Sequence, residues 1–125
     1  MSFVAQSRLS RFEPMLKLHP EEQAWLDQYR EALLEQQPGV VARMLIYGSK
    51  ARGDARQDSD LDVLLIVRNE AGALKRTLRH IGYELAATSY AVPSIMAYTQ
   101  DEWQQRAERG YPFQNAVERE GVSVL

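Results

Sequence analysis

Cysteine is absent from this chain of 125 residues. Its absence excludes a disulfide scaffold and any metal site built on thiolates, and it fits a cytoplasmic protein. Long apolar runs are also absent. Residues 1–14 lack the apolar stretch of a signal peptide, and no run approaches the roughly 18 apolar residues that cross a bilayer. We therefore expect a soluble, cytoplasmic protein without a membrane partner.

A charge excess of either sign is missing too. The 15 Lys and Arg residues face 17 Asp and Glu residues, for a net charge of -2. Nucleic-acid-binding domains usually carry a basic excess, so this balance argues against a nucleic acid as partner. The length is that of one ordinary domain. We expect a single domain over residues 1–125, with an irregular segment over residues 1–18, because Pro14 disfavours one continuous helix there.

Hydrophobic periodicity predicts alternating helices and strands. Strands are expected over residues 40–47, 61–67 and 92–98, with a strand-like C-terminus. Helices are expected from residue 20 to the Pro-Gly pair at 38–39, briefly after residue 49, over 71–88, from 99 to 110, and around 113–119. The strand over 61–67 is apolar on both faces except at Asp62, which indicates a central, buried position. The order predicts an α/β (α+β) fold with a small mixed β-sheet flanked by helices.

Two carboxylates, Asp60 and Asp62, stand two residues apart where the central strand begins. Side chains two apart in a strand point to the same face, with Cα atoms roughly 6–7 Å apart. Such a pair can share Mg²⁺, which prefers one or two carboxylates together with phosphate oxygens and water. By itself, the Ser-Asp-Leu-Asp segment also fits a solvated loop in which Ser59 or Asp60 caps a turn.

A glycine and a serine, Gly48 and Ser49, follow the preceding strand. Glycine allows the backbone to approach a ligand closely, and the N–H groups at a helix start bind phosphate. The alternative is that Gly48 only turns the chain and that Ser49 only caps the next helix.

The two features together form a more specific pattern. A strand ends in Gly-Ser, a short segment containing Ala-Arg-Gly follows, and Ser-Asp-x-Asp opens the next strand. Over residues 44–67 the sequence resembles the minimal nucleotidyltransferases of the DNA polymerase beta-like nucleotidyltransferase superfamily. The resemblance implies the nucleotidyltransferase fold, catalytic and metal-binding roles for Asp60 and Asp62, and a triphosphate-binding turn at Gly48 and Ser49. It also implies Mg²⁺ or Mn²⁺ as the metal and ATP as the substrate.

Lys50 and Arg52 are the cations nearest to the predicted phosphate-binding turn. Either side chain could stabilise charge on the triphosphate or on the leaving pyrophosphate. Arg52 also fits the Ala-Arg-Gly pattern of the minimal nucleotidyltransferases. The alternative is that both are exposed helix residues.

A third carboxylate, which the resemblance implies on the following strand, is missing. It would complete the metal cluster and could serve as the base for the incoming hydroxyl. Residues 92–98 contain no acid, and the expected position falls at Ser94 or Met96. Serine ligates weakly, and the soft sulfur of methionine does not suit Mg²⁺. Other acids could enter the site instead, and the candidates are Glu84, Asp54 and Asp58.

Two main functions therefore stay open. The first is an enzyme that transfers a nucleoside monophosphate, expected to be AMP, from a nucleoside triphosphate with Mg²⁺ to a protein hydroxyl. The resemblance implies a small helical HEPN-type protein as partner, which the chain would neutralise as an antitoxin. The second is a catalytically degenerate fold that binds a partner without turnover. A third possibility is a small-molecule transferase of the aminoglycoside-modifying kind. It is less expected, because such an enzyme usually needs a further domain or a dimer to form its acceptor pocket.

Overall fold

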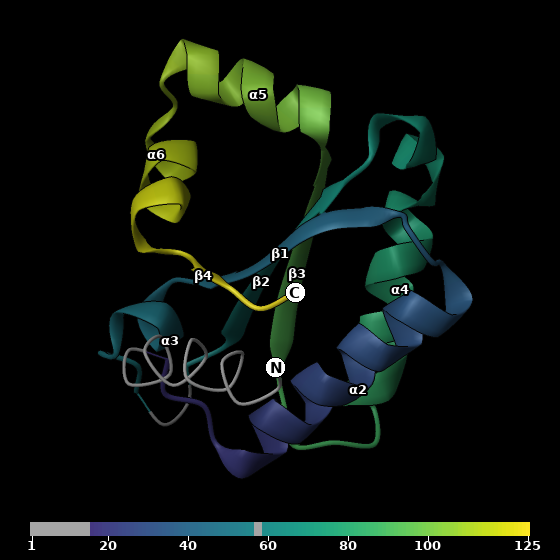
Figure 1. Cartoon of the computed structure of the whole chain (residues 1–125). Helices are drawn as coiled ribbons and strands as arrows, with labels where there is room; N and C mark the ends of the chain where they lie inside the picture. The colour runs from purple at the N-terminus through teal and green to yellow at the C-terminus, as the bar shows by residue number, and fades with distance from the viewer. Residues whose placement is uncertain (1–15, 57–58) are drawn as a thin grey trace, which may run out of the picture.

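The structure is a computed structural model that describes residues 16–56 and 59–125. Most of the segment expected to be irregular, and Asp58, lie outside the described residues. The elements follow one another along the chain as Figure 1 shows: α2 (Pro20–Gln36), β1 (Val41–Tyr47), α3 (Ser49–Arg52), β2 (Leu61–Val67), the 3₁₀ helix η2 (Asn69–Leu74), α4 (Lys75–Ala86), β3 (Pro93–Thr99), α5 (Gln100–Arg109), α6 (Pro112–Glu120) and β4 (Val122–Ser123). Among the described helices, none is long and apolar enough to cross a membrane.

The four strands form one mixed sheet in the order β3-β2-β1-β4. β1 runs antiparallel to both β2 and β4, whereas β2 runs parallel to β3. Every residue of β2 except Asp62 is buried, as predicted for a central strand. This arrangement confirms the predicted fold class of a small mixed sheet flanked by helices.

One face of the sheet is covered by α2 and α4, which lie together on the same side in Figure 1. Two hydrogen bonds join these helices: Trp25 Nε1 donates to the carbonyl of Gly82 over 2.9 Å, and Tyr29 Oη donates to that of Leu78 over 2.7 Å. Successive side chains of a strand alternate between faces, so Val63 and Leu65 enter this core. The aromatic residues of α2 thus bury apolar area and satisfy their polar atoms at once.

The opposite face is covered by α5 and α6, which lie on the other side of the sheet in Figure 1. Leu64 and Ile66 of β2 pack here against Trp103 and Val117. Asp62 has the same parity along β2 as Leu64, so its carboxylate also projects on the α5/α6 side. The strand therefore determines on which face any chemistry of Asp62 takes place.

Two helix starts bear on the sequence predictions. The capping box at the start of α5 is confirmed, because Thr99 Oγ1 accepts the Glu102 N–H over 3.1 Å and Glu102 Oε1 accepts the Thr99 N–H over 2.7 Å. The helix expected over residues 71–88 is shorter than predicted. It begins as the 3₁₀ helix η2, in which Ala71 has φ -107° and ψ 16°, and regular α4 starts only at Lys75.

A buried ion pair joins α2 to α3. Lys50 Nζ lies 3.1 Å from Glu22 Oε1, and the two side chains are only 2% and 7% exposed. The same Glu22 oxygen accepts the N–H of His19 over 2.9 Å and so caps α2. Buried charges are tolerated only when they are paired, so each residue depends on the other.

We predict that Lys50→Met lowers the free energy of unfolding by about 3–5 kcal/mol, because it leaves Glu22 buried without its countercharge. Urea denaturation followed by circular dichroism measures this loss. The double variant Glu22→Met/Lys50→Met should recover most of it, except for about 1 kcal/mol from the lost cap. A single variant as stable as the wild type would contradict the assignment.

Candidate functional site

The site is centred on the first residues of β2, where two neighbouring strands present side chains to the same face. Asp62 is paired with Tyr47 of β1 and with Ser94 of β3. Its side chain is partly buried, whereas Asp60 stands exposed just before the strand. The predicted carboxylate pair thus lies at the edge of the α5/α6 face, with one member inside the sheet and one in solvent.

Gly48 brings the backbone of the turn against the carboxylate of Asp62. Its torsion angles, φ 75° and ψ -153°, belong to a region that is essentially restricted to glycine. A Cβ at this position would overlap Oδ2 of Asp62 and lie 3.3 Å from its Cγ. The turn and the carboxylate, predicted from separate stretches of sequence, are therefore in direct contact.

The surroundings of Asp62 disfavour the ionised form of its carboxylate when no cation is bound. Burial, and next the charge of Asp60, raise the pKa of Asp62, while the guanidinium of Arg52 acts in the opposite direction. Burial and the neighbouring Asp62 also raise the pKa of Tyr47 to about 12. A bound cation would relieve the repulsion between the two carboxylates, which is the behaviour expected of a metal site.

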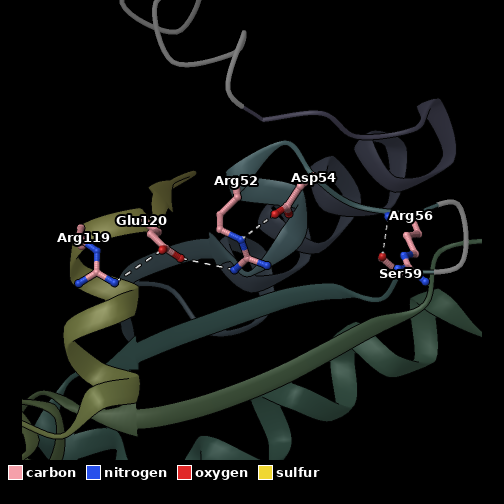
Figure 2. Close-up of polar contacts among 6 residues, drawn as sticks. All are labelled: Arg52, Asp54, Arg56, Ser59, Arg119 and Glu120. Carbon is pink, nitrogen blue, oxygen red and sulfur yellow. Dashed lines mark hydrogen bonds and ion pairs between the residues drawn. The ribbon is translucent and has the colours of Figure 1, made fainter.

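Just before Asp60, two hydrogen bonds join Arg56 to Ser59. The Arg56 N–H donates to Ser59 Oγ over 2.8 Å, and the Ser59 N–H donates to the Arg56 carbonyl over 3.0 Å (Figure 2). These reciprocal bonds fix Arg56 and Ser59 relative to each other. Ser59, which the sequence offers as a capping residue, thus holds the segment from which Asp60 projects.

Arg52 lies at the end of α3 between two acids (Figure 2). Its Nε donates to Asp54 Oδ2 over 3.3 Å, and its Nη1 lies 3.5 Å from Glu120 Oε2 at the end of α6. Both contacts raise the pKa of Arg52, the one to Asp54 more strongly. Glu120 was not predicted as a site residue, because 68 residues separate it from Arg52 and no local pattern marks it.

Lys50, the other predicted phosphate-binding cation, is placed differently. Its ammonium group pairs with Glu22, although its side chain also borders a cavity of about 370 Å³ beside α3. That cavity carries several positive side chains, and its lining residues are Lys17, His19, Lys50, Gly53, Ala55 and Arg56. The structure therefore gives Lys50 a structural partner and leaves its predicted role in phosphate binding as a prediction.

Both positions at which the sequence places the expected third carboxylate, Ser94 and Met96, lie on β3 next to β2. Ser94 lies directly beside Asp62 in the parallel register, and Met96 lies beside Leu64, so both share the face of Asp62. Glu84 lies on α4 across the sheet and pairs with His80. Asp54 pairs with Arg52. Within residues 16–56 and 59–125, no three His, Cys, Asp or Glu side chains form a metal-binding group.

The two remaining carboxylates still fit a divalent cation that also binds phosphate. Mg²⁺ is commonly held by one or two carboxylates together with substrate phosphates and water. Gly48 has no side chain that would collide with the Asp62 carboxylate, and α3 begins at the next residue, Ser49. Asp60 and Asp62 could therefore hold the metal, with Gly48 and Ser49 next to the phosphates.

Comparisons with known proteins agree with this arrangement. Residues 26–109 match the family model described as the nucleotidyltransferase domain. The match covers more than half of the chain, which therefore belongs to the nucleotidyltransferase domain family. Domains of this family generally use a nucleoside triphosphate and a divalent metal.

A crystal structure from Sulfolobus solfataricus, described as that of a candidate nucleotidyltransferase, has the same fold. It superposes with a TM-score of 0.53 at 15% sequence identity, covering 82% of this chain and 78% of that one. At this identity the likeness concerns the fold alone. No curated protein sequence matches the chain.

We predict that Gly48→Ala destabilises the protein by at least about 1–3 kcal/mol through backbone strain, and displaces Asp62 in addition. Gly39→Ala is the matched control, because Gly39 also has positive φ but a Cβ there would meet nothing within 4 Å. Urea denaturation should show a loss for both variants. Only Gly48→Ala should abolish the thermal stabilisation by Mg²⁺ with an ATP analogue that carries a methylene group between the α and β phosphorus.

We also predict that Asp62→Asn stabilises the ligand-free protein at neutral pH. Because the folded state raises the pKa of Asp62, it binds the proton more tightly than the unfolded chain, so ionised Asp62 destabilises the fold. That penalty disappears as the pH falls through the raised pKa. Thermal unfolding measured between pH 4 and 8 should show a higher midpoint temperature for Asp62→Asn than for the wild type only at the upper end of this range. An advantage that persists at low pH would contradict the electrostatic origin.

Proposed function

We propose that the chain is a minimal nucleotidyltransferase that transfers AMP from ATP to a hydroxyl of a small helical HEPN-type protein and thereby acts as its antitoxin. The observation that supports it best is the contact between Gly48 and Asp62, which joins the phosphate-binding turn to the carboxylate pair. Membership of the nucleotidyltransferase family supports nucleotide transfer in general.

In this proposal each side chain has a defined task. The N–H groups at the start of α3 and the Ser49 hydroxyl hold the phosphates, and Arg52 offsets the charge of the leaving pyrophosphate. The acceptor oxygen bonds to the α-phosphorus as the bond to the bridging oxygen of the β-phosphate breaks. The hydroxyl proton passes to solvent or to a base on the acceptor. Mg²⁺ held by Asp60 and Asp62 would supply charge neutralisation of the phosphates.

One observation favours a second function. Neither Ser94 nor Met96, the two positions expected to carry a third carboxylate, can act as a base, and Ser94 is the one that lies beside Asp62. A chain of this kind could bind nucleotide and partner without turnover. The alternative is therefore a catalytically degenerate nucleotidyltransferase fold that neutralises its partner by binding alone.

Transfer of a radioactive label separates the two functions. We expect the wild-type protein, incubated with ATP labelled at the α-phosphate, Mg²⁺ and the small helical protein encoded beside it, to label that protein. Asp60→Ala/Asp62→Ala should remove the label and keep partner binding. Absence of label with the wild type, together with unchanged partner binding by the double variant, would refute the enzyme and support the binding module.

Ser94→Asp sharpens the same experiment, because it places a carboxylate in the register position beside Asp62. If transfer is limited by the missing base, the initial rate should rise, by as much as about 10²-fold. Ser94→Asn is the matched control, with nearly the same volume and no charge. Equal rates for the two variants would show that a base at this position is not limiting.

A further inference from the structure

A polar cleft lies on α5, away from the first residues of β2. It has a volume of about 230 Å³, and its lining residues are Tyr98, Glu102, Gln105, Arg106, Arg109 and Tyr111. The four from α5 recur three or four residues apart and so form one stripe along the helix. Tyr98 and Tyr111 flank the stripe from the end of β3 and from the turn before α6. Nothing in the proposed transfer reaction uses these residues.

The guanidinium of Arg106 is held between the two tyrosine rings. Its Cζ lies 4.7 Å from the centroid of the Tyr98 ring and 5.4 Å from that of Tyr111. These distances lie within the range of cation–π contacts, and a guanidinium carries five N–H donors in its plane. Within the part of the chain that the structure describes, Arg106 takes part in no ion pair. Two ring contacts thus restrict this guanidinium, while no carboxylate of the described residues pairs with it.

Arg109 places a second positive charge in the same cleft. Its Nη1 donates to Tyr111 Oη over 3.4 Å, a contact that raises the pKa of Arg109 and lowers that of Tyr111. The single acid of the cleft, Glu102, is already engaged elsewhere. Its carboxylate accepts Lys75 Nζ over 2.8 and 3.1 Å and caps α5 through the Thr99 N–H. Among the described residues, Glu102 pairs with Lys75 and with neither arginine of the cleft.

We propose that this cleft binds an acidic segment of a partner protein, with one carboxylate of that segment taken by the Arg106 guanidinium and a second by Arg109. Arginine forms paired hydrogen bonds with carboxylates, and a pre-oriented guanidinium loses less entropy on binding. Single-stranded nucleic acid fits less well. Bases stack on free aromatic faces, whereas Tyr98 already contacts Arg106 and the Trp103 ring, whose centroid lies 5.3 Å away.

The place of the cleft connects it to the transfer site. Tyr98 and Ser94 lie on the same face of β3, four residues and therefore roughly 13 Å apart. A protein docked at Arg106 could thus present a hydroxyl near Asp62. This link rests on the proposed function, whereas acidic-peptide binding itself does not.

A tetraglutamate peptide with blocked ends is the probe, titrated into the full chain by isothermal calorimetry without nucleotide. We expect saturable 1:1 binding that weakens at least about tenfold in Arg106→Gln, because a charge-assisted bidentate contact is lost. Arg106→Lys, which keeps the charge and lacks the planar fork, should bind with intermediate affinity. Arg76→Gln is the matched control, since Arg76 is an exposed arginine on α4 outside the cleft.

Several outcomes would overturn the proposal. They are no binding by the wild type, equal weakening by Arg106→Gln and Arg76→Gln, and tighter Arg106-dependent binding of inorganic phosphate or of an oligothymidine than of the peptide. Circular dichroism verifies that each variant is folded. Peptide binding that survives in Asp60→Ala/Asp62→Ala, with no label transfer by the wild type, would refute the transferase function and leave the cleft assignment intact. Label transfer by the wild type without peptide binding would support the transferase function and refute the cleft assignment.

Discussion

At the end of β1 the backbone of Gly48 passes so close to β2 that any side chain there would collide with the Asp62 carboxylate. The rest of the site depends on this contact. It requires a torsion-angle pair that glycine alone adopts readily, and it sets the start of α3 beside a partly buried acid. Burial and Asp60 make the ionised carboxylate unfavourable without a countercharge. The same geometry that destabilises the ligand-free protein is therefore suited to a cation and phosphates.

Two ion pairs of different character join the short helix α3 to the rest of the molecule. On one side, Lys50 is buried against Glu22, which also caps α2, so the turn proposed to bind phosphate is anchored to α2. On the other side, Arg52 contacts Glu120 through exposed groups at the end of α6. Exposed pairs contribute little stability, so the contact of Arg52 with Glu120 is far easier to break than that of Lys50 with Glu22.

The two faces of the sheet differ in the side chains that they carry. α2 and α4 cover one face with aromatic residues whose polar atoms are bonded internally. Asp62, Ser94 and Tyr98 all project on the other face, next to α5 and α6. On this face a serine, and no third carboxylate, stands beside Asp62. The cleft that contains Arg106 and Arg109 adds positive charge further along the same face. Under the proposed function, these features favour recognition of the acceptor over general-base chemistry.

Local sequence determined much of this protein. The apolar run over residues 61–67 predicts β2 with its observed bounds, the capping box predicts the start of α5, and the Gly-Ser and Asp-x-Asp segments predict the turn and the acids of the site. Only the tertiary structure decided the rest. The 3₁₀ start before α4, the pairing of Lys50 with Glu22, and the contacts of Arg52 with Glu120 and of Arg106 with Tyr98 were not predicted. Periodicity reports which face of an element is apolar, whereas the partner of a charged side chain depends on how distant elements pack.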